Sequence, residues 1–339
     1  MKKTIAMILA FVMALSLMAG CGNEATPAAT QAPAAATEAA EQKGTEVFRV
    51  AFLPTDMSLT FASWLAEELE TAFAVYDNME LTVIDSQNKL ETQISNMETC
   101  VSQGYDYIIL LPIEPAAEDD IVAQYIADGT PMMMINLDDF GVEAASSVIA
   151  NPYDLGTVVA ELAKTKLAED ANVVILLGPS GNTDSIERRR AYEELLLGGS
   201  KITILDEQLG DWEKGKGMEL MENWLQVHGD KIDAVLSMND AMAIGAYEAA
   251  KDAGYEDILF FGVDGLADAA LSIKEGGLDA TALQDAKVMA EEAARVVNSV
   301  LTGENKEGYE KVQIPVTLID ESNVDEFIER YTANGMISK

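Results

Sequence analysis

Cysteine, histidine and basic side chains are scarce in this chain, and each shortage argues against a class of function. Only two of the 339 residues are cysteines, so neither a disulfide framework nor a zinc site built from Cys and His is expected. The single histidine, His228, precedes Gly229 at a predicted helix end, where a solvated capping role fits better than catalysis. The 22 basic residues stand against 58 acidic ones, and a formal net charge of −36 repels phosphate backbones. We therefore expect no nucleic-acid partner.

Sequence motifs of common enzymes are also missing. The chain has no Gly-x-Ser-x-Gly elbow and no Gly-x-Gly-x-x-Gly loop. Residues 210–216 have the spacing of a phosphate-binding loop, but Gly217 stands where the Mg²⁺-binding hydroxyl belongs. We expect a binding protein that is not an enzyme and that uses no cofactor and no metal.

The N-terminus has the features of an export signal. Lys2 and Lys3 precede an apolar run over 5–17, which is too short to span a membrane, and Met18–Cys21 resembles the bacterial lipobox. The alternative is an ordinary cleavage site that abuts a cysteine. We expect residues 1–21 to be a lipoprotein signal peptide, with Cys21 lipidated. Residues 22–46 lack periodicity and are rich in Ala, Thr, Pro, Gln and Glu, so they predict a disordered tether. Together these segments predict an extracytoplasmic protein that is lipid-anchored to the cell membrane.

From residue 47 onward, short apolar runs alternate with segments of helical periodicity. This alternation predicts an α/β fold with doubly wound parallel sheets, and the pattern restarts after about residue 167. Two similar halves in one chain place a ligand cleft between them. The predicted strands are 47–53, 81–84, 107–111, 132–135, 147–150, 173–177, 202–205, 234–237, 258–261, 280–283 and 312–318.

The segment 234–265 predicts the most specific part of the site. It reads as strand, helix and strand, with Asn239 following the first strand and Asp264 following the second. Ligands bind at the carboxyl ends of parallel strands, so both side chains are expected in one crevice. An amide beside a carboxylate suits a ligand rich in hydroxyl groups. The alternative is that Asn239 and Asp240 only cap the helix that follows them, and that Asp264 likewise caps the next one.

Two aromatic side chains and one arginine extend this candidate site. Phe61 and Trp212 both follow predicted strand ends, where their rings can pack on the C–H face of a sugar. The alternative for both is packing within the protein core. Arg188, in a run of three arginines early in a predicted helix, is the one nearest to the preceding loop. Cys100 is predicted to be a buried core thiol.

Several segments together resemble the type I periplasmic sugar-binding proteins, most closely the glucose/galactose- and ribose-binding proteins. The segments are MNDAMAIGA at 238–246, FFGVDG at 260–265, DSQN at 85–88, PMMMIN at 131–136, DW at 211–212 and TALQDA at 281–286. The resemblance covers roughly residues 47–323. It implies two lobes, joined by three crossing strands, that close on one monosaccharide and deliver it to the permease of an ABC importer.

The resemblance also implies roles for individual residues. Phe61 and Trp212 would sandwich the sugar ring. The hydroxyl groups would be bound by Asn136, Asp184, Arg188, Asn239, Asp264 and Gln284, with Asn182 as a weaker match. Two leucines depart from the family pattern: Leu59 replaces a carboxylate of the glucose/galactose group, and Leu111 replaces a ribose-binding amide. The identity of the sugar therefore stays open.

The family pattern places the crossings near Asn151, Gln284 and Gln313. The N-terminal lobe would comprise 47–151 plus 285–312, and the C-terminal lobe 152–284 plus 313–339. We expect a monomer. A role as the sugar-sensing module of a membrane chemoreceptor or sensor kinase remains an alternative to import. A sugar-responsive repressor is rejected, because an acidic tether stands where its DNA-binding helices would be.

Overall fold

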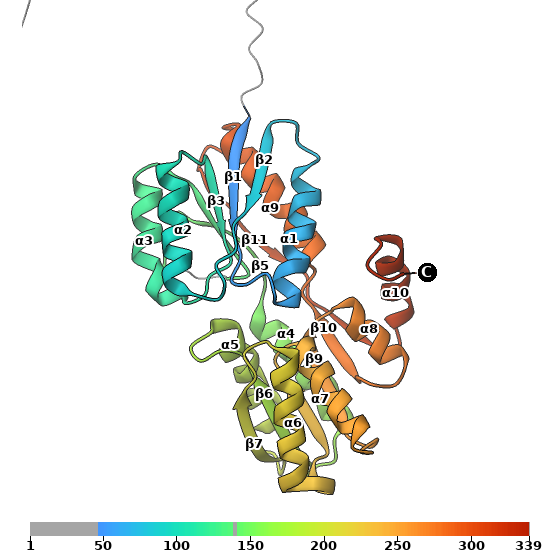
Figure 1. The fold of residues 1–339 in the computed structure, drawn as a ribbon. Helices are drawn as coiled ribbons and strands as arrows, with labels where there is room; N and C mark the ends of the chain where they lie inside the picture. The colour runs from blue at the N-terminus through green and yellow to red at the C-terminus, as the bar shows by residue number, and fades with distance from the viewer. Residues whose placement is uncertain (1–46, 138–140, 339) are drawn as a thin grey trace, which may run out of the picture. The chain divides into compact units, whose positions relative to one another are not determined.

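The computed structural model describes residues 47–137 and 141–338, which form two α/β lobes, each built on one six-stranded sheet (Figure 1). The two-lobed fold of parallel sheets predicted from the sequence is confirmed. The predicted signal peptide at 1–21, the tether at 22–46 and Cys21 lie outside the described residues. None of the helices in the described part of the chain has the length and apolarity that a membrane span requires.

The first lobe, called lobe 1 below, contains a sheet in the order β11-β5-β4-β3-β1-β2, in which all strands are parallel. Its strands are β1 (Phe48–Leu53), β2 (Met79–Val83), β3 (Tyr107–Leu110), β4 (Met132–Ile135), β5 (Ser146–Ala150) and β11 (Lys311–Ile314). Its helices are α1 (Thr60–Phe73), α2 (Leu90–Ser102), α3 (Pro115–Ala127) and α9 (Ala286–Leu301).

Alternating side chains of the central strands bury both faces of this sheet. Ile109 points into the cluster that α1 and α9 share, whereas Ile108 and Leu110 point into a cluster with α2 and α3. Because successive strand residues face opposite sides, a continuous apolar run is what a doubly covered strand requires. Cys100 of α2 lies fully buried in the second cluster, which confirms the predicted core thiol, and burial raises its pKa to about 11.

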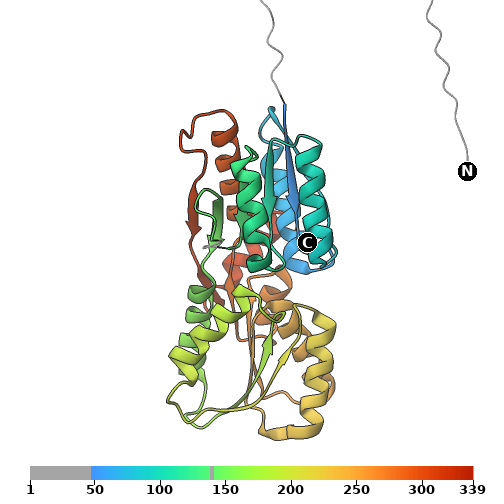
Figure 2. The same cartoon turned by 90° about the vertical axis from the view of Figure 1, so that its left-hand side faces the viewer.

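The second lobe, lobe 2, has the sheet order β12-β10-β9-β8-β6-β7, in which only β12 runs antiparallel to its neighbour. Its strands are β6 (Asn172–Leu177), β7 (Thr203–Leu209), β8 (Ala234–Ser237), β9 (Leu259–Asp264), β10 (Ala280–Leu283) and β12 (Thr317–Asp320). Its helices are α4 (Pro152–Lys166), α5 (Thr183–Tyr192), α6 (Lys214–His228), α7 (Asp240–Asp252), α8 (Ala267–Lys274) and α10 (Val324–Ala333). Figure 1 and Figure 2 show the pair α4 and α5 on one side of this sheet and the pair α6 and α7 on the other.

Close helix packing explains the glycine at 217, which follows the phosphate-loop spacing at 210–216. A side chain at Gly217 of α6 would meet the backbone of Met242 in α7, with a β-carbon only 2.4 Å from its carbonyl oxygen. Gly217 therefore permits α6 and α7 to pack closely. Lys216 forms ion pairs with Asp211 and Glu213 at the surface. Helix α6 ends at His228, and Gly229 follows with a positive φ of 54°, as a helix end requires.

The chain passes between the two sheets three times. The first passage is at Asn151 between β5 and α4, and the second is at Gln284 and Asp285 between β10 and α9. The third is at Pro315 and Val316, because β11 pairs with β5 of lobe 1 and β12 pairs with β10 of lobe 2. The single strand predicted over 312–318 is therefore wrong. The predicted boundary after residue 312 falls inside β11, since the proline that interrupts pairing comes after Ile314.

Candidate functional site

A cavity with about 660 Å³ of empty space, part of it open to solvent, lies between the loops of lobe 1 and lobe 2. Most of its polar side chains stand at or just after the carboxyl ends of strands, which is where parallel sheets place ligands. All nine residues predicted to contact a ligand line this cavity: Phe61, Asn136, Asn182, Asp184, Arg188, Trp212, Asn239, Asp264 and Gln284.

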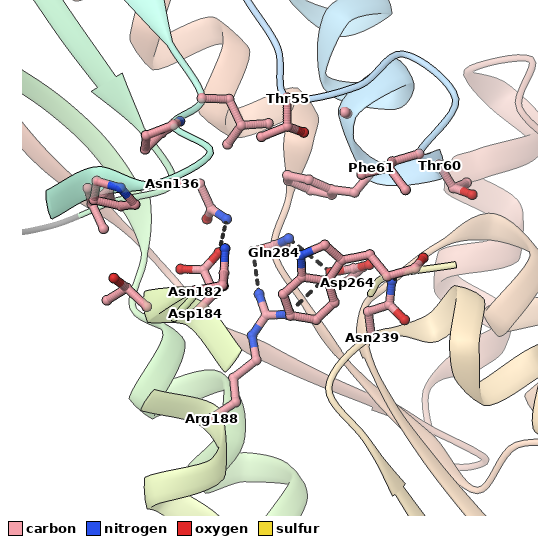
Figure 3. Close-up of a pocket in the computed structure, with 18 residues that line it drawn as sticks. Thr55, Thr60, Phe61, Asn136, Asn182, Asp184, Arg188, Asn239, Asp264 and Gln284 are labelled. Atoms are coloured by element: carbon pink, nitrogen blue, oxygen red, sulfur yellow. Dashed lines mark hydrogen bonds and ion pairs between the residues drawn. The ribbon is translucent and has the colours of Figure 1, made fainter. Parts of the chain in front are cut away.

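Arg188 is the centre of the polar side of the cavity. Its side chain is only 2% exposed, although it reaches the cavity from the middle of α5. Its Nη1 donates to the backbone oxygen of Met238 at 2.6 Å, and its Nη2 donates to Oε1 of Gln284 at 3.1 Å. Figure 3 shows the guanidinium pointing from α5 toward Gln284 and Asp264. These bonds fix a cation at the base of the cavity.

Asp264 ends β9 and is buried beside this guanidinium. Its Oδ1 accepts a hydrogen bond from Nε2 of Gln284 at 2.9 Å and lies 3.8 Å from Nη1 of Arg188. Burial raises the pKa of Asp264 well above its usual value, and Arg188 offsets part of this rise. Asp264 makes no cap, because α8 has Leu266 at its N-cap position. The capping alternative for Asp264 is therefore wrong.

Two further carboxyl groups surround the arginine. Burial raises the pKa of Asp184, which lines the cavity, to about 6, with Arg188 lowering it in part. Asp240 lies behind the cavity wall, where burial raises its pKa to about 6. Its Oδ2 accepts from the backbone N–H of Leu266 at 2.8 Å. Of the three carboxyl groups near this guanidinium, Asp184 and Asp264 line the cavity, and such acceptors suit a ligand with several hydroxyl donors.

Trp212 covers part of this polar cluster. The guanidinium carbon of Arg188 lies 5.7 Å from the centre of the Trp212 ring, and the same ring packs on the backbone of Gly178. A β-carbon at Gly178 would lie 2.1 Å from the indole, so only glycine leaves room for it. Trp212 is half-buried, so it combines packing on its own lobe with an exposed face toward the cavity.

Phe61 stands on the opposite side of the cavity, near the start of α1 (Figure 3). Its ring makes an edge contact with Trp64, with ring centres 6.1 Å apart. Phe61 is also half-buried, and it belongs to lobe 1, whereas Trp212 belongs to lobe 2. The two aromatic side chains therefore come to one cavity from different lobes, which is the arrangement that a ring sandwich needs.

The two asparagines that follow strands of lobe 2 serve as helix caps as well as lining the cavity. Oδ1 of Asn239 accepts from the N–H of Met242 at 2.9 Å, and its Nδ2 donates to the backbone oxygen of Trp212 at 3.2 Å. Asn182 accepts from the N–H of Ser185 at 3.1 Å. Asn239 thus caps the helix that follows it and also lines the cavity. The cap bonds orient these amides toward the cavity.

A hydrogen bond joins the two lobes across the cavity. Nδ2 of Asn136, which follows β4 of lobe 1, donates to Oδ2 of Asp184 in lobe 2 at 2.7 Å. Figure 3 shows these two side chains pointing at each other. A ligand that reaches both groups would bind residues of both lobes at once.

Three lining residues adopt positive φ angles that non-glycine residues rarely adopt. The angles are 64° at Asn136, 68° at Trp212 and 128° at Asp264. Such conformations cost about 1–3 kcal/mol each and gather at functional sites. Three of the six non-glycine residues with a positive φ in the described part of the chain thus line the cavity.

Sequence reasoning missed some lining residues, chiefly Thr55, Pro112, Leu137 and Thr183. Leu137 directly follows Asn136 at a strand end, and Thr183 directly precedes Asp184. Their adjacency to residues already predicted for the site is the sequence signal that could have identified them. Asp240 was assigned only a capping role. In the described residues, no group of three or more His, Cys, Asp or Glu side chains could hold a metal ion.

Comparison with known proteins places this fold and cavity in a family. Residues 50–305 match the model of the periplasmic binding protein domain. A xylitol-binding protein of Mycolicibacterium smegmatis is 28% identical over 83% of this chain and 79% of its own length. The ribose import binding protein of Bacillus subtilis is 32% identical over 66% of this chain and 72% of its own length.

A solved structure agrees with these sequence matches. The crystal structure of an ABC transporter solute-binding protein from Bacillus halodurans, with bound myo-inositol, superposes with a TM-score of 0.79 and 27% identity. That match covers 85% of this chain and all of the other one. The family predicted from the sequence is confirmed: this chain belongs to the periplasmic binding protein family.

Proposed function

We propose that this protein captures a monosaccharide or a closely related cyclic polyol between its two lobes and delivers it to an ABC importer. The relatives named above bind xylitol or ribose, or hold myo-inositol, all of which are small and rich in hydroxyl groups. The cavity of this chain offers donors and acceptors that match such a ligand. Its described lining includes no Ser, Cys, His or Lys side chain, and binding without chemistry is the function that fits it best.

One observation carries the proposal: the hydrogen-bonded group of Arg188, Gln284 and Asp264 lies beside the exposed face of Trp212. The group presents charged donors and acceptors, which make the stronger hydrogen bonds to hydroxyls. The indole presents an apolar face on which the C–H side of a sugar ring can pack. Polar edges and an apolar face together are what a sugar ring requires.

A thermal-shift screen of monosaccharides and cyclic polyols tests the proposal. A ligand at 100 times its Kd should add about 2.7 kcal/mol to the free energy of unfolding, which is a readily measured shift. Calorimetric titration of each hit should then give one site per chain. No stabilisation by any sugar or polyol would contradict the proposal.

The role in import has its own test. Deleting the gene should lower uptake of the identified ligand by the native host. Normal uptake together with a lost transcriptional or chemotactic response would instead favour the sensor alternative.

We further propose that lipid on Cys21 anchors the protein to the outer face of the cell membrane, with 22–46 as tether and the protein acting as a monomer. The motif at Met18–Cys21 and the apolar run over 5–17 support this proposal. The protein should fractionate with membranes, and Cys21→Ser should release it or leave it unprocessed. Mass spectrometry that finds Cys21 unmodified in protein from the native host would contradict the anchor.

A further inference from the structure

Polar and apolar groups are divided unequally between the two sides of the cavity. Among the described residues, the ionisable side chains that line it are Asp184, Arg188 and Asp264, and these three belong to lobe 2. On the side of lobe 1, the lining includes Leu59, Leu111, Pro112 and Leu137, together with the ring of Phe61. A ligand in this cavity therefore meets hydrogen-bonding groups on one side and a largely apolar wall on the other.

Two leucines of this wall follow strand ends, and the third precedes a helix. Leu111 follows β3, and Leu137 comes two residues after β4. Leu59 is the N-cap residue of α1, where its side chain makes no capping bond. Leu111 is held firmly, because its N–H bonds to the oxygen of Leu53 at 3.1 Å and its oxygen accepts from Nε2 of Gln93 at 3.0 Å. The backbone at Leu111 is thus fixed by the fold, so this leucine keeps its place in the wall.

In the described part of lobe 1, few polar groups line the cavity. The lining contributed by lobe 1 includes the polar side chains of Thr55, Thr60 and Asn136. Nδ2 of Asn136 already donates to Asp184. A ligand hydroxyl that faces Leu59, Leu111 and Leu137, out of reach of those three polar side chains, would lose its hydrogen bonds to water without replacement. A methyl group at the same place would gain from leaving water.

We propose that the ligand carries a methyl group on the edge that faces lobe 1, and that its class is the 6-deoxyhexoses. In these sugars a methyl group replaces the hydroxymethyl group of the parent hexose, while the ring hydroxyls that Asp264, Arg188 and Asp184 would bind are kept. This inference rests on the proposed function, because it assumes that the cavity binds a sugar. It adds the chemical feature by which the cavity selects among sugars.

Matched pairs of sugars that differ by one oxygen atom test the inference by calorimetric titration. Suitable pairs are D-galactose with D-fucose, L-galactose with L-fucose, L-mannose with L-rhamnose, and D-glucose with 6-deoxy-D-glucose; methyl ethers of the parent sugars form a further arm. The tightest pair should favour the deoxy member by about 10- to 100-fold, which is the range over which an apolar pocket discriminates against an added hydroxyl. A methyl ether that binds tightest would overturn the assignment to 6-deoxyhexoses, because the methyl group would then come from an ether.

The outcomes separate this inference from the proposed function. Equal or tighter binding of the parent hexose in the tightest pair would overturn the inference and leave sugar binding intact. Tight binding confined to fully hydroxylated ligands, such as ribose or myo-inositol, would also overturn the inference without contradicting the proposed function. If no sugar or polyol binds at all, both the proposed function and the inference fail.

Variants of the wall give a second test. Leu59→Asn and Leu111→Asn each place an amide on the apolar side, and at least one should reduce the preference for the deoxy sugar by about tenfold. Leu209→Asn is the matched control, because Leu209 ends β7, is 44% exposed and does not line the cavity. Circular dichroism establishes that each variant is folded. A preference that stays unchanged in both folded wall variants would overturn the inference.

Discussion

At the scale of single residues, the site depends on one guanidinium that serves several partners. Arg188 binds the oxygen of Met238 and Oε1 of Gln284 and lies near Asp264, so it holds the amide and the carboxylate in a fixed arrangement. Its burial makes those bonds stronger than they would be in water. Burial of the surrounding carboxyl groups raises their pKa. A ligand whose hydroxyl groups donate hydrogen bonds to these carboxyl groups therefore relieves an unfavourable environment.

Replacing Asp264 by asparagine should weaken ligand binding while leaving the fold intact. The change keeps the shape of the side chain and tolerates the positive φ of this position, but it removes a charged acceptor. The expected loss is about 1.5–3 kcal/mol, or roughly ten- to over a hundredfold in Kd, measured by calorimetric titration. Asp268→Asn, at an exposed position in the first turn of α8, is the control. Unchanged affinity in folded Asp264→Asn would remove this residue from the site.

Trp212, in the loop before α6, and Trp224, in α6, should respond differently to truncation to alanine. We expect Trp212→Ala to lower affinity, because about 80–100 Å² of apolar contact with the sugar supplies roughly 2–2.5 kcal/mol. That corresponds to about a thirty- to seventyfold rise in Kd. Trp224 is 3% exposed and donates from Nε1 to Asp206 at 2.7 Å, so Trp224→Ala should mainly lower stability.

Titration calorimetry and urea unfolding of both tryptophan variants separate the two roles. Trp212 also packs on Gly178, so its truncation should cost some stability, but less than that of Trp224. Normal sugar affinity in Trp212→Ala, combined with a loss of several kcal/mol of stability, would mean that the indole is a structural side chain of lobe 2.

At the scale of elements, the sequence predicted the parts of the fold that depend on local patterns. Strands β4, β8 and β10 were predicted with the bounds that the structure has, because short apolar runs between turn residues are unambiguous in a buried parallel sheet. Asn239 and Asp264 could be placed in one crevice for the same reason, since neighbouring parallel strands end at one edge.

Other elements depend on contacts that the local pattern does not encode. Helix α3 was not assigned, since it opens with Pro115 and buries Val122 and Tyr125 without a strong apolar stripe. Strands β11 and β12 read as one apolar run, although they pair with different sheets. The positive φ of Trp212 and the wall position of Leu137 are likewise set by tertiary packing. What the local pattern did not show is thus the third change of lobe, at Pro315 and Val316, and how the side chains of the site turn.

Asp240 joins two elements of lobe 2, and its charge should make the stability of the protein depend on pH. It begins α7, and its Oδ2 accepts from the N–H of Leu266 in the loop between β9 and α8. Burial raises its pKa from 3.8 to about 6 in the folded protein. Between these values the folded state binds more protons than the unfolded state, so this group stabilises the fold at low pH and loses that contribution as pH rises through 6.

The variant Asp240→Asn should therefore be more stable than the natural protein at pH 7.5 and about equally stable near pH 4. A tenfold change in proton affinity is worth about 1.4 kcal/mol, so the gain at pH 7.5 should be on the order of 1–3 kcal/mol. Urea unfolding of the ligand-free proteins at pH 4, 5, 6 and 7.5 measures it. A stability difference that does not change with pH would show that the Asp240 carboxyl is not the titrating group.

At the scale of the whole binding domain, ligand contacts and lobe connections share residues. Gln284 stands in the second passage between the lobes, and it also bonds to both Arg188 and Asp264. Asn136 and Asp184 join the lobes directly across the cavity. A ligand that binds these groups acts on the connection between the lobes as well as on the cavity itself. A ligand shifts the equilibrium between two arrangements of the lobes when it binds one arrangement more tightly than the other.

We therefore expect ligand binding to close the two lobes. Three short connections allow a hinge motion, and a sugar that bridges Asn136 of lobe 1 and the polar group of lobe 2 stabilises only the closed arrangement. Small-angle X-ray scattering should show a smaller radius of gyration at saturating ligand than without it. Arg188→Met is the matched control, because it removes the cation of the cavity and should show no compaction at the same sugar concentration. Superimposable scattering curves for the natural protein with and without saturating ligand would contradict closure, since a cavity lined by both lobes would then bind its ligand without moving either.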